Sequence, residues 1–250
     1  MVDNVKYSKE QCPEPGSEEH AYMQSVPYRE LLGSLLYATG IRGDIAQAVN
    51  VLSRFASNPA KIHWKALKRV LIYLNTTSPE GHPAGLGAHK KSIKPDRALR
   101  IMVDADHGGC VDTRRSTSGI YIRAFGDTVL AKSKRQGRVS HATGSAEFNA
   151  IATACRKARN LLIVMEDLGF PQRQVLIESD SQVAVDMLKK GRLTEASKHH
   201  ALDFYEAKEM IDSGVIVLRH VPGDDNTSDI LTKPLPGPAF EKHARSLLHY

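Results

Sequence analysis

The sequence predicts an α/β protein, with a five-stranded mixed sheet and flanking helices preceded by a small helical segment. Three observations support this fold class. Residues 28–78 carry apolar residues at helical spacing, and residues 98–250 alternate short β-rich runs with helical patterns. The composition of 41% hydrophobic and 25% charged residues is ordinary for a globular protein. The 250 residues are therefore expected to form one large domain or two small ones.

Four segments are expected along the chain. Residues 1–26 lack apolar periodicity and contain a Pro-x-Pro-Gly stretch, which predicts an extended leader. Residues 27–78 predict three short helices, because their leucines and other apolar residues recur at i, i+4 spacing. Residues 79–97 are rich in Gly, Pro, His and Lys, which is typical of a linker. Residues 98–250 form the predicted α/β part.

Within the α/β part, the order is three strands, a helix, a strand, two helices, a strand and a helix. The strands are expected at Leu99–Val103, Gly119–Phe125, Asp127–Ser133, Val175–Glu178 and Gly214–Val221. The second and third strands are expected to meet in a hairpin at Gly126-Asp127. Helices are expected at Ser145–Leu168, Gln182–Lys190 and Leu202–Ile211, and a last helix is expected to begin near Ser228.

The overall charge is a weak indication of function. With 34 Lys+Arg and 28 Asp+Glu the chain carries +6, of which residues 1–97 contribute +4 and residues 98–250 contribute +2. Such a modest excess does not identify a nucleic-acid-binding protein, because the clustering of charge matters more than its total.

Several functional classes are excluded by the pattern of apolar residues and cysteines. The longest aliphatic run, Leu161–Met165, is too short to cross a membrane, and residues 1–9 contain no apolar signal segment. Cys12, Cys110 and Cys155 match neither a disulfide framework nor a metal-ligand spacing. We therefore expect an intracellular protein with reduced cysteines.

Basic residues gather in two places. The third expected helix carries one cluster on one face, and the third expected strand and its following loop carry the other, with no acidic residue between positions 128 and 146. Each cluster is consistent with contact to a phosphate backbone or with an ordinary solvated face. The residues proposed for nucleic-acid contact are Lys61, Lys65 and Lys68 in the first cluster and Lys132, Lys134, Arg135 and Arg138 in the second.

Four carboxylates stand at predicted strand ends or helix starts: Asp104, Glu147, Asp180 and Asp229. Each has a purely structural interpretation, as a turn residue for Asp104, a helix N-cap for Asp180 and Asp229, and a partner of the helix dipole for Glu147. Glu147, however, is four residues from Ile151 on the core-facing stripe, where an unpaired charge is costly.

Taken together, the four carboxylates favour a metal site. The carboxyl ends of neighbouring parallel strands form the usual site in α/β sheets, and Asp104 and Asp180 follow two such strands. Four converging carboxylates repel one another, which raises the pKa of at least one of them. Two Mg²⁺ ions would relieve that repulsion, because they are positively charged and prefer oxygen ligands such as carboxylates. A pair of metal ions of this kind supports phosphodiester cleavage.

Several motifs, in their order along the chain, resemble the Pol polyproteins of copia-type retrotransposons. Two motifs resemble the segment that follows the polymerase core: Tyr28–Tyr37 and His63–Leu74. Six others resemble the ribonuclease H domain of the same family: Val103–Asp106, Asp112–Gly119, Ser145–Phe148, Asp180–Gln182, Ser197–His199 and Asp229–Leu235. The resemblance covers residues 20–240.

The resemblance implies a ribonuclease H-like fold and activity. Its Asp-Glu-Asp-Asp set falls on the four carboxylates named above, which would bind two Mg²⁺ ions, with Mn²⁺ as an alternative, and hydrolyse the RNA strand of an RNA–DNA hybrid. Ser181 and Gln182 would contact nucleic acid. Residues 27–78 would be thumb- or connection-like helices of a reverse transcriptase, with the upstream polymerase domain as a partner. The implied location is cytoplasmic, with virus-like particles as a more specific setting.

Some residues depart from the family pattern. No His lies in Pro222–Ser228, where many ribonucleases H carry one. His199 or His200 either takes the place of that loop histidine or is a locally packed structural residue. His107 replaces the usual tryptophan, and Ser145 stands where a second glutamate is common.

Two other functions remain as alternatives. The polymerase motif Tyr-x-Asp-Asp is absent, so the chain is not a reverse transcriptase by itself. An inactive nucleic-acid-binding remnant is the main rival to the enzyme, although the presence of all four carboxylates argues against it. An integrase-like strand transferase is less favoured, because such enzymes use fewer carboxylates at other spacings.

Overall fold

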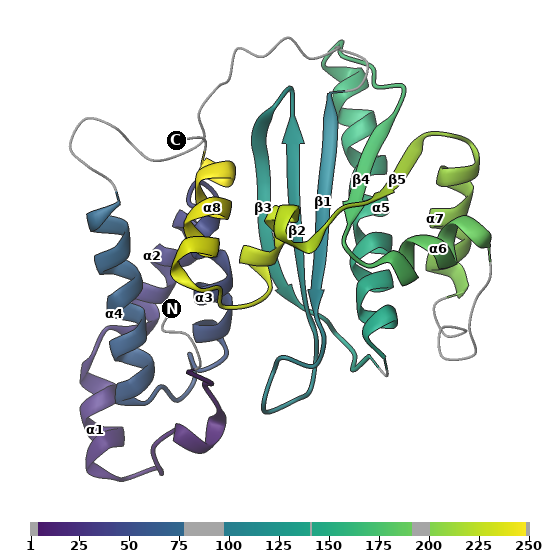
Figure 1. Cartoon of the computed structure of the whole chain (residues 1–250). Coiled ribbons are helices and arrows are strands. Elements are labelled where there is room, and N and C mark those ends of the chain that lie inside the picture. Colours follow the sequence, from purple (N-terminus) through teal and green to yellow (C-terminus); the bar gives the residue numbers. More distant parts are fainter. Residues whose placement is uncertain (1–4, 78–97, 141, 192–200, 249–250) are drawn as a thin grey trace.

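A computed structural model describes residues 5–77, 98–140, 142–191 and 201–248. The α/β part contains a five-stranded sheet of order β3-β2-β1-β4-β5 (Figure 1). β1 (Leu99–Asp106), β2 (Thr117–Ala124) and β3 (Asp127–Arg135) are antiparallel neighbours, whereas β4 (Val175–Ser179) and β5 (Ile216–His220) run parallel to β1. The predicted mixed five-stranded sheet is therefore confirmed.

Helices cover both faces of the sheet. α5 (Thr143–Asp167), α6 (Gln182–Lys190) and α7 (Ala201–Asp212) share a core with one face (Figure 1). α8 (Gly237–Leu248) and the 3-10 helix η6 (Thr227–Leu231) pack on the other face; the short 3-10 helix η5 (Gly223–Asp225) precedes η6. Because strand side chains alternate, Ile101 and Val103 of β1 point toward α5, while Met102 and Asp104 point toward η6 and α8.

The N-terminal segment forms a separate small core. It contains α1 (Glu18–Ser25), α2 (Tyr28–Ala38), α3 (Ala46–Ser53) and α4 (Lys61–Thr76), with 3-10 turns η1 (Lys9–Gln11) and η2 (Gly43–Ile45). The three helices predicted in this part correspond to α2, α3 and α4. Their apolar stripes meet around Leu32, Leu52 and Leu67, and the buried Tyr28 hydroxyl donates to the Leu52 carbonyl at 2.9 Å.

One part of the predicted extended leader is helical. Ser17 caps α1 by accepting a hydrogen bond from the His20 amide at 3.1 Å, two glutamates occupy the first turn, and Met23 packs into the small core. The sequence of α1 shows no apolar stripe, because Met23 is the one buried side chain of this helix. The predicted linker, residues 79–97, lies outside the described residues.

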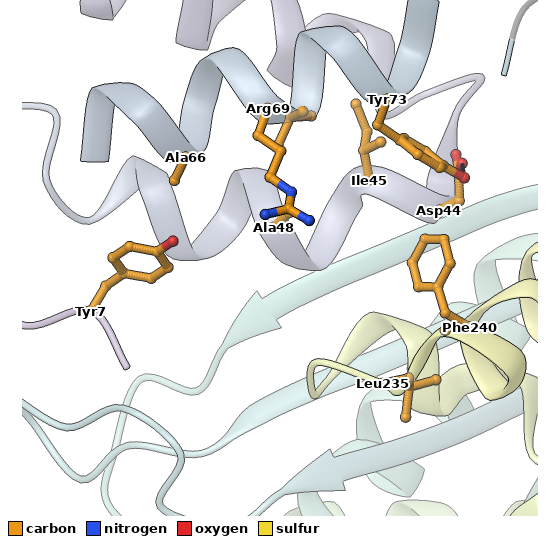
Figure 2. A pocket seen from close by; sticks show the side chains of 11 residues that line it. Tyr7, Asp44, Ile45, Ala48, Ala66, Arg69, Tyr73, Leu235 and Phe240 are labelled. Carbon is orange, nitrogen blue, oxygen red and sulfur yellow. Dashed lines mark hydrogen bonds between the residues drawn. The ribbon is translucent and has the colours of Figure 1, made fainter. Parts of the chain in front are cut away.

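The helical segment packs directly against the sheet. Along β3, the Asn50 side chain of α3 donates to the Ser133 hydroxyl at 2.9 Å. Gly43 approaches the same strand so closely that a Cβ atom there would lie 2.4 Å from the Ala131 Cβ atom, so a larger residue does not fit. A cavity of about 240 Å³ lies between α3, α4 and α8; Arg69 points into it and Phe240 lines its α8 side (Figure 2). None of the predicted site residues lines this cavity.

Two local predictions require correction. The hairpin turn is Phe125-Gly126, one residue earlier than expected, and both residues adopt positive φ, 54° and 95°. No α-helix begins near Ser228: η6 forms there, and α8 starts only at Gly237. The reason is Pro234, whose missing N–H and ring are incompatible with the interior of a helix started at Ser228. Among the described residues, no helix has the length and apolarity needed to span a bilayer.

Candidate active site

The structure brings the predicted aspartates together at the carboxyl end of β1 and β4. Asp104 lies near the end of β1, Asp180 directly follows β4, and Asp229 lies in η6. One oxygen atom from each lies within 4.8 Å of the other two. Glu147, in the first turns of α5, is close enough for its pKa to respond to Asp104 and Asp180. The three aspartates therefore converge in the fold, whereas Glu147 lies near them without belonging to the 4.8 Å group.

Gly119 allows η6 to reach the end of β1. It is paired with Asp104 across the β1–β2 ladder. A Cβ atom at this position would lie 2.7 Å from the Ser228 carbonyl oxygen and 2.9 Å from the Leu231 Cβ atom, so only glycine leaves room for the 3-10 helix. Thr232, at the end of η6, then donates its hydroxyl to Asp104 Oδ2. This close approach is what places Asp229 beside Asp104.

Asn226 holds Asp180 in place and was not identified from the sequence. Its side chain is fully buried, and Nδ2 donates both to the Val103 carbonyl at 2.9 Å and to Asp180 Oδ1 at 3.2 Å. Its Oδ1 accepts from the Ser228 amide at 3.3 Å, so the same residue caps η6. The only sequence signal was an Asn three residues before a candidate ligand.

Burial and mutual repulsion make the carboxyl groups reluctant to ionise. Burial, followed by the charges of Asp104 and Asp180, raises the pKa of Glu147 to about 9. Burial also raises the pKa of each aspartate, with further contributions from Asp229 at Asp104 and from Asp104 at Asp180. Glu147 Oε2 and Asp229 Oδ1 are buried without a hydrogen-bond partner in the described part of the chain.

Lys233 is the cation that the sequence reasoning missed. Its Nζ lies 2.9 Å from Asp229 Oδ2, four residues earlier in the chain. Burial opposes the charged form of Lys233, but Asp104 and Asp229 outweigh that effect and raise the pKa of the ammonium group. One ammonium group thus offsets part of the charge of four carboxylates.

A basic groove of about 710 Å³ lies between the β2–β3 hairpin and α5. All four predicted residues of the second basic cluster line it: Lys132, Lys134, Arg135 and Arg138. Arg156 and Lys157 of α5, which the apolar helical pattern did not reveal, also line the groove, and Arg156 pairs there with Asp203. Burial and the neighbouring Lys132 and Lys134 lower the pKa of Lys157, which reflects the concentration of positive charge. Ser118 of β2, which pairs with Ala105 next to Asp104, also lines the groove, so the groove begins near the carboxylates.

The other residues predicted to contact nucleic acid lie outside the basic groove. Ser181 caps α6 by accepting from the Ala184 amide at 3.3 Å, and Gln182 donates to Asp186 at 2.6 Å on the same helix. The three predicted lysines of α4 are exposed and do not line the groove: Lys61, Lys65 and Lys68.

Histidines near the site include one that was overlooked. His220 ends β5, directly before the histidine-free loop, and its Nε2 lies 3.1 Å from the Asp180 carbonyl oxygen. His107 is hydrogen-bonded through Nε2 to the Ser140 carbonyl at 3.1 Å. His199 and His200 lie outside the described residues.

Comparison with known proteins identifies relatives but no matching family model. The chain is 34% identical over 242 residues to the Retrovirus-related Pol polyprotein from transposon TNT 1-94 of Nicotiana tabacum, covering 96% of this chain and 18% of that protein. It is 30% identical over 223 residues to the Retrovirus-related Pol polyprotein from transposon RE2 of Arabidopsis thaliana, covering 88% and 15% respectively. The chain therefore spans less than a fifth of these relatives. A crystal structure of RNase H1 from Halobacterium salinarum NRC-1 is 19% identical, with a TM-score of 0.40, covering 54% of this chain and 94% of that one.

Proposed function

Because this chain belongs to the Pol polyproteins of copia-type retrotransposons and carries their C-terminal reverse transcriptase and ribonuclease H region, we propose that it hydrolyses the RNA strand of RNA–DNA hybrids. The observation that carries this proposal is the convergence of Asp104, Asp180 and Asp229 within 4.8 Å, with Glu147 beside them. The proposed partners are the hybrid and the polymerase domain of the reverse transcriptase.

The donor set suits divalent magnesium. All the available ligand atoms are carboxylate oxygens, which Mg²⁺ and Mn²⁺ prefer, and the unpartnered Glu147 Oε2 and Asp229 Oδ1 need a positive neighbour. The four carboxylates together would hold two Mg²⁺ ions. Bound there, the ions would supply an activated water and charge stabilisation for the leaving 3′ oxygen, so cleavage would leave 3′-hydroxyl and 5′-phosphate ends.

The residues of the chain orient these ligands and bind the substrate. Asn226 and Thr232 fix the carboxylates of Asp180 and Asp104, so ligand geometry is set before any ion binds. We propose that the basic groove holds the phosphate backbone of the hybrid, which is recognised through groove shape and 2′-hydroxyl groups rather than base sequence. Gln182, exposed next to Asp180, is proposed to contact the same substrate, and the lysines of α4 to contact the duplex beyond it.

A cleavage assay tests the proposal. Purified protein is incubated with Mg²⁺ and a hybrid labelled on the RNA strand, beside Asp180→Asn and the matched Asp186→Asn, which changes a half-exposed aspartate of α6. We expect wild type and Asp186→Asn to cut the RNA and Asp180→Asn to leave it intact.

Two outcomes contradict the proposal in different ways. Intact RNA with wild-type protein, where a control ribonuclease H cuts, refutes the enzyme and supports the inactive nucleic-acid-binding remnant if the hybrid is still bound. Equal cleavage by Asp180→Asn and wild type refutes the assignment of the site.

A further inference from the structure

We propose that Arg100 and Arg219, oriented by the buried Glu178, form a second phosphate-binding surface beside the carboxylate cluster. Glu178 of β4 is fully buried, and an arginine from each neighbouring strand pairs with it. Arg100 of β1 bonds Oε2 through Nε, and Arg219 of β5 bonds Oε1 through Nε at 3.0 Å and through Nη2. The paired guanidinium groups compensate a carboxylate that could not otherwise be buried at this position.

The arginines are fixed but remain open to solvent. Their side chains are 40% and 55% exposed, for Arg100 and Arg219 respectively, although both are anchored on Glu178. A guanidinium group has five donors, and Glu178 engages one from Arg100 and two from Arg219. Within the described chain, the remaining donors have no partner. Two cations sharing one anion leave a net positive charge, and planar, oriented donors of this kind match phosphate oxygens.

The surface adjoins the site on the α8 face of the sheet. Arg100 precedes Asp104 by four residues on β1, so both side chains lie on the α8 face, and Glu178 of β4, paired with Met102, points to the same face two residues before Asp180. At about 3.3 Å per residue, these separations are about 13 Å and 7 Å along the strands. Arg219 directly precedes His220, whose ring contacts the Asp180 carbonyl. The arginines thus continue the carboxylate cluster along the sheet.

The basic groove lies on the opposite side of the cluster. Lys132 and Lys134 point from β3 toward α5, whereas Arg100 and Arg219 lie on the α8 face. The carboxylates at the strand ends therefore stand between two positive surfaces. Phosphates of one strand follow each other at about 3.4 Å along a duplex axis, so a strand cut at the carboxylates reaches the arginines within a few nucleotides. The occupant proposed for this surface is therefore the phosphate backbone of the bound nucleic acid.

This inference rests on the proposed function, and binding without cleavage tests it. A fluorescent hybrid is titrated with protein in EDTA at several salt concentrations, and affinity is read from anisotropy. Arg100→Gln/Arg219→Gln should weaken binding about tenfold at 0.1 M salt and lower the slope of log K against log salt by about 1 to 2, because two phosphate contacts are lost. Arg100→Lys/Arg219→Lys should keep most of the slope. The matched Arg245→Gln, on an exposed arginine of α8, should change neither quantity.

A purely structural role would give a different result. If the arginines only neutralise Glu178, their replacement lowers the melting temperature but leaves the salt slope unchanged, and that outcome overturns the inference. If the double glutamine variant fails to fold, Glu178→Gln is introduced into the same variant to remove the buried charge. The triple variant should show the same loss in the slope of log K against log salt. If wild type binds the hybrid and the arginine variants bind it equally well, only this second surface is refuted. No binding of hybrid by wild type overturns both this surface and the proposed function.

Discussion

Replacing Glu147 by glutamine should stabilise the metal-free protein while abolishing activity. Glu147 is buried beside Asp104 and Asp180, and its Oε2 has no hydrogen-bond partner in the described part of the chain. The variant keeps the size of the side chain and removes its ability to ionise. The effect should therefore depend on pH, because only the wild-type residue changes charge.

The magnitude follows from the pKa of Glu147, which rises from 4.5 to about 9 on folding. A carboxyl group with a raised folded pKa binds its proton more tightly in the folded state, so it has no adverse effect below pH 4.5 and destabilises the protein increasingly as pH rises toward 9. At pH 7 the charge of Glu147 should lower the free energy of unfolding of wild type by about 3 kcal/mol relative to the glutamine variant, at 1.36 kcal/mol per unit of pKa. For a chain of this size that corresponds to about 6 to 12 °C in melting temperature.

Thermal unfolding between pH 4.5 and 8.5 measures this effect. In EDTA, the melting temperature of Glu147→Gln should equal that of wild type at the acid end and exceed it progressively toward neutral pH. Saturating Mg²⁺ should raise the melting temperature of wild type more than that of the variant. Parallel curves for the two proteins across this range would refute the assignment of Glu147 to a crowded, buried acidic site.

Three other substitutions test how the site is built. Lys233→Met removes the ammonium group that pairs with Asp229, so Mg²⁺ should bind several-fold more tightly in calorimetry; weaker binding would show that Lys233 assists the ion instead. Gly119→Ala introduces a methyl group 2.7 Å from the Ser228 carbonyl oxygen, and denaturant unfolding should show a loss of about 1 to 3 kcal/mol; an unchanged midpoint would contradict the close approach of η6. Asn226→Ala leaves the buried Val103 carbonyl without its donor, and the free energy of unfolding should fall by about 1 to 3 kcal/mol, with a rise in the Mg²⁺ concentration needed for half-saturation; no change in either would remove Asn226 from its positioning role.

The elements with strong periodicity were predictable from the sequence. The apolar stripe of α5 and the β-rich runs of the sheet identified the fold, because local pattern and tertiary burial agree there. The last helix was wrongly placed, since its prolines allow only a 3-10 turn at Asp229. The hairpin turn was shifted by one residue because Phe125 adopts positive φ, which a bulky side chain rarely does.

The candidate carboxylates were easier to predict than the residues that hold them in place. The four candidate carboxylates are acidic residues at predicted strand ends or helix starts, so the sequence alone could single them out, and the structure brings the three aspartates together. Lys233 pairs with Asp229 only four residues earlier, but that spacing alone does not distinguish it from an ordinary surface pair. Asn226 and Arg219 act through contacts with distant strands, and such pairings leave no local signal in one sequence. The same is true of Arg156 and Lys157, whose positive face becomes a groove only when α5 packs beside the hairpin.

The packing of α3 along β3 bears on how the protein can be dissected. β3 is an edge strand, and Ala131 and Ser133 point from it to the α8 face of the sheet. In the intact chain, Gly43 and Asn50 contact these two side chains, and Ala46 joins the apolar cluster of that face. A fragment beginning at residue 98 would lose these contacts and expose apolar side chains of β2 and β3 to water. We therefore expect a fragment that includes the helical segment to be more stable than one that begins at residue 98.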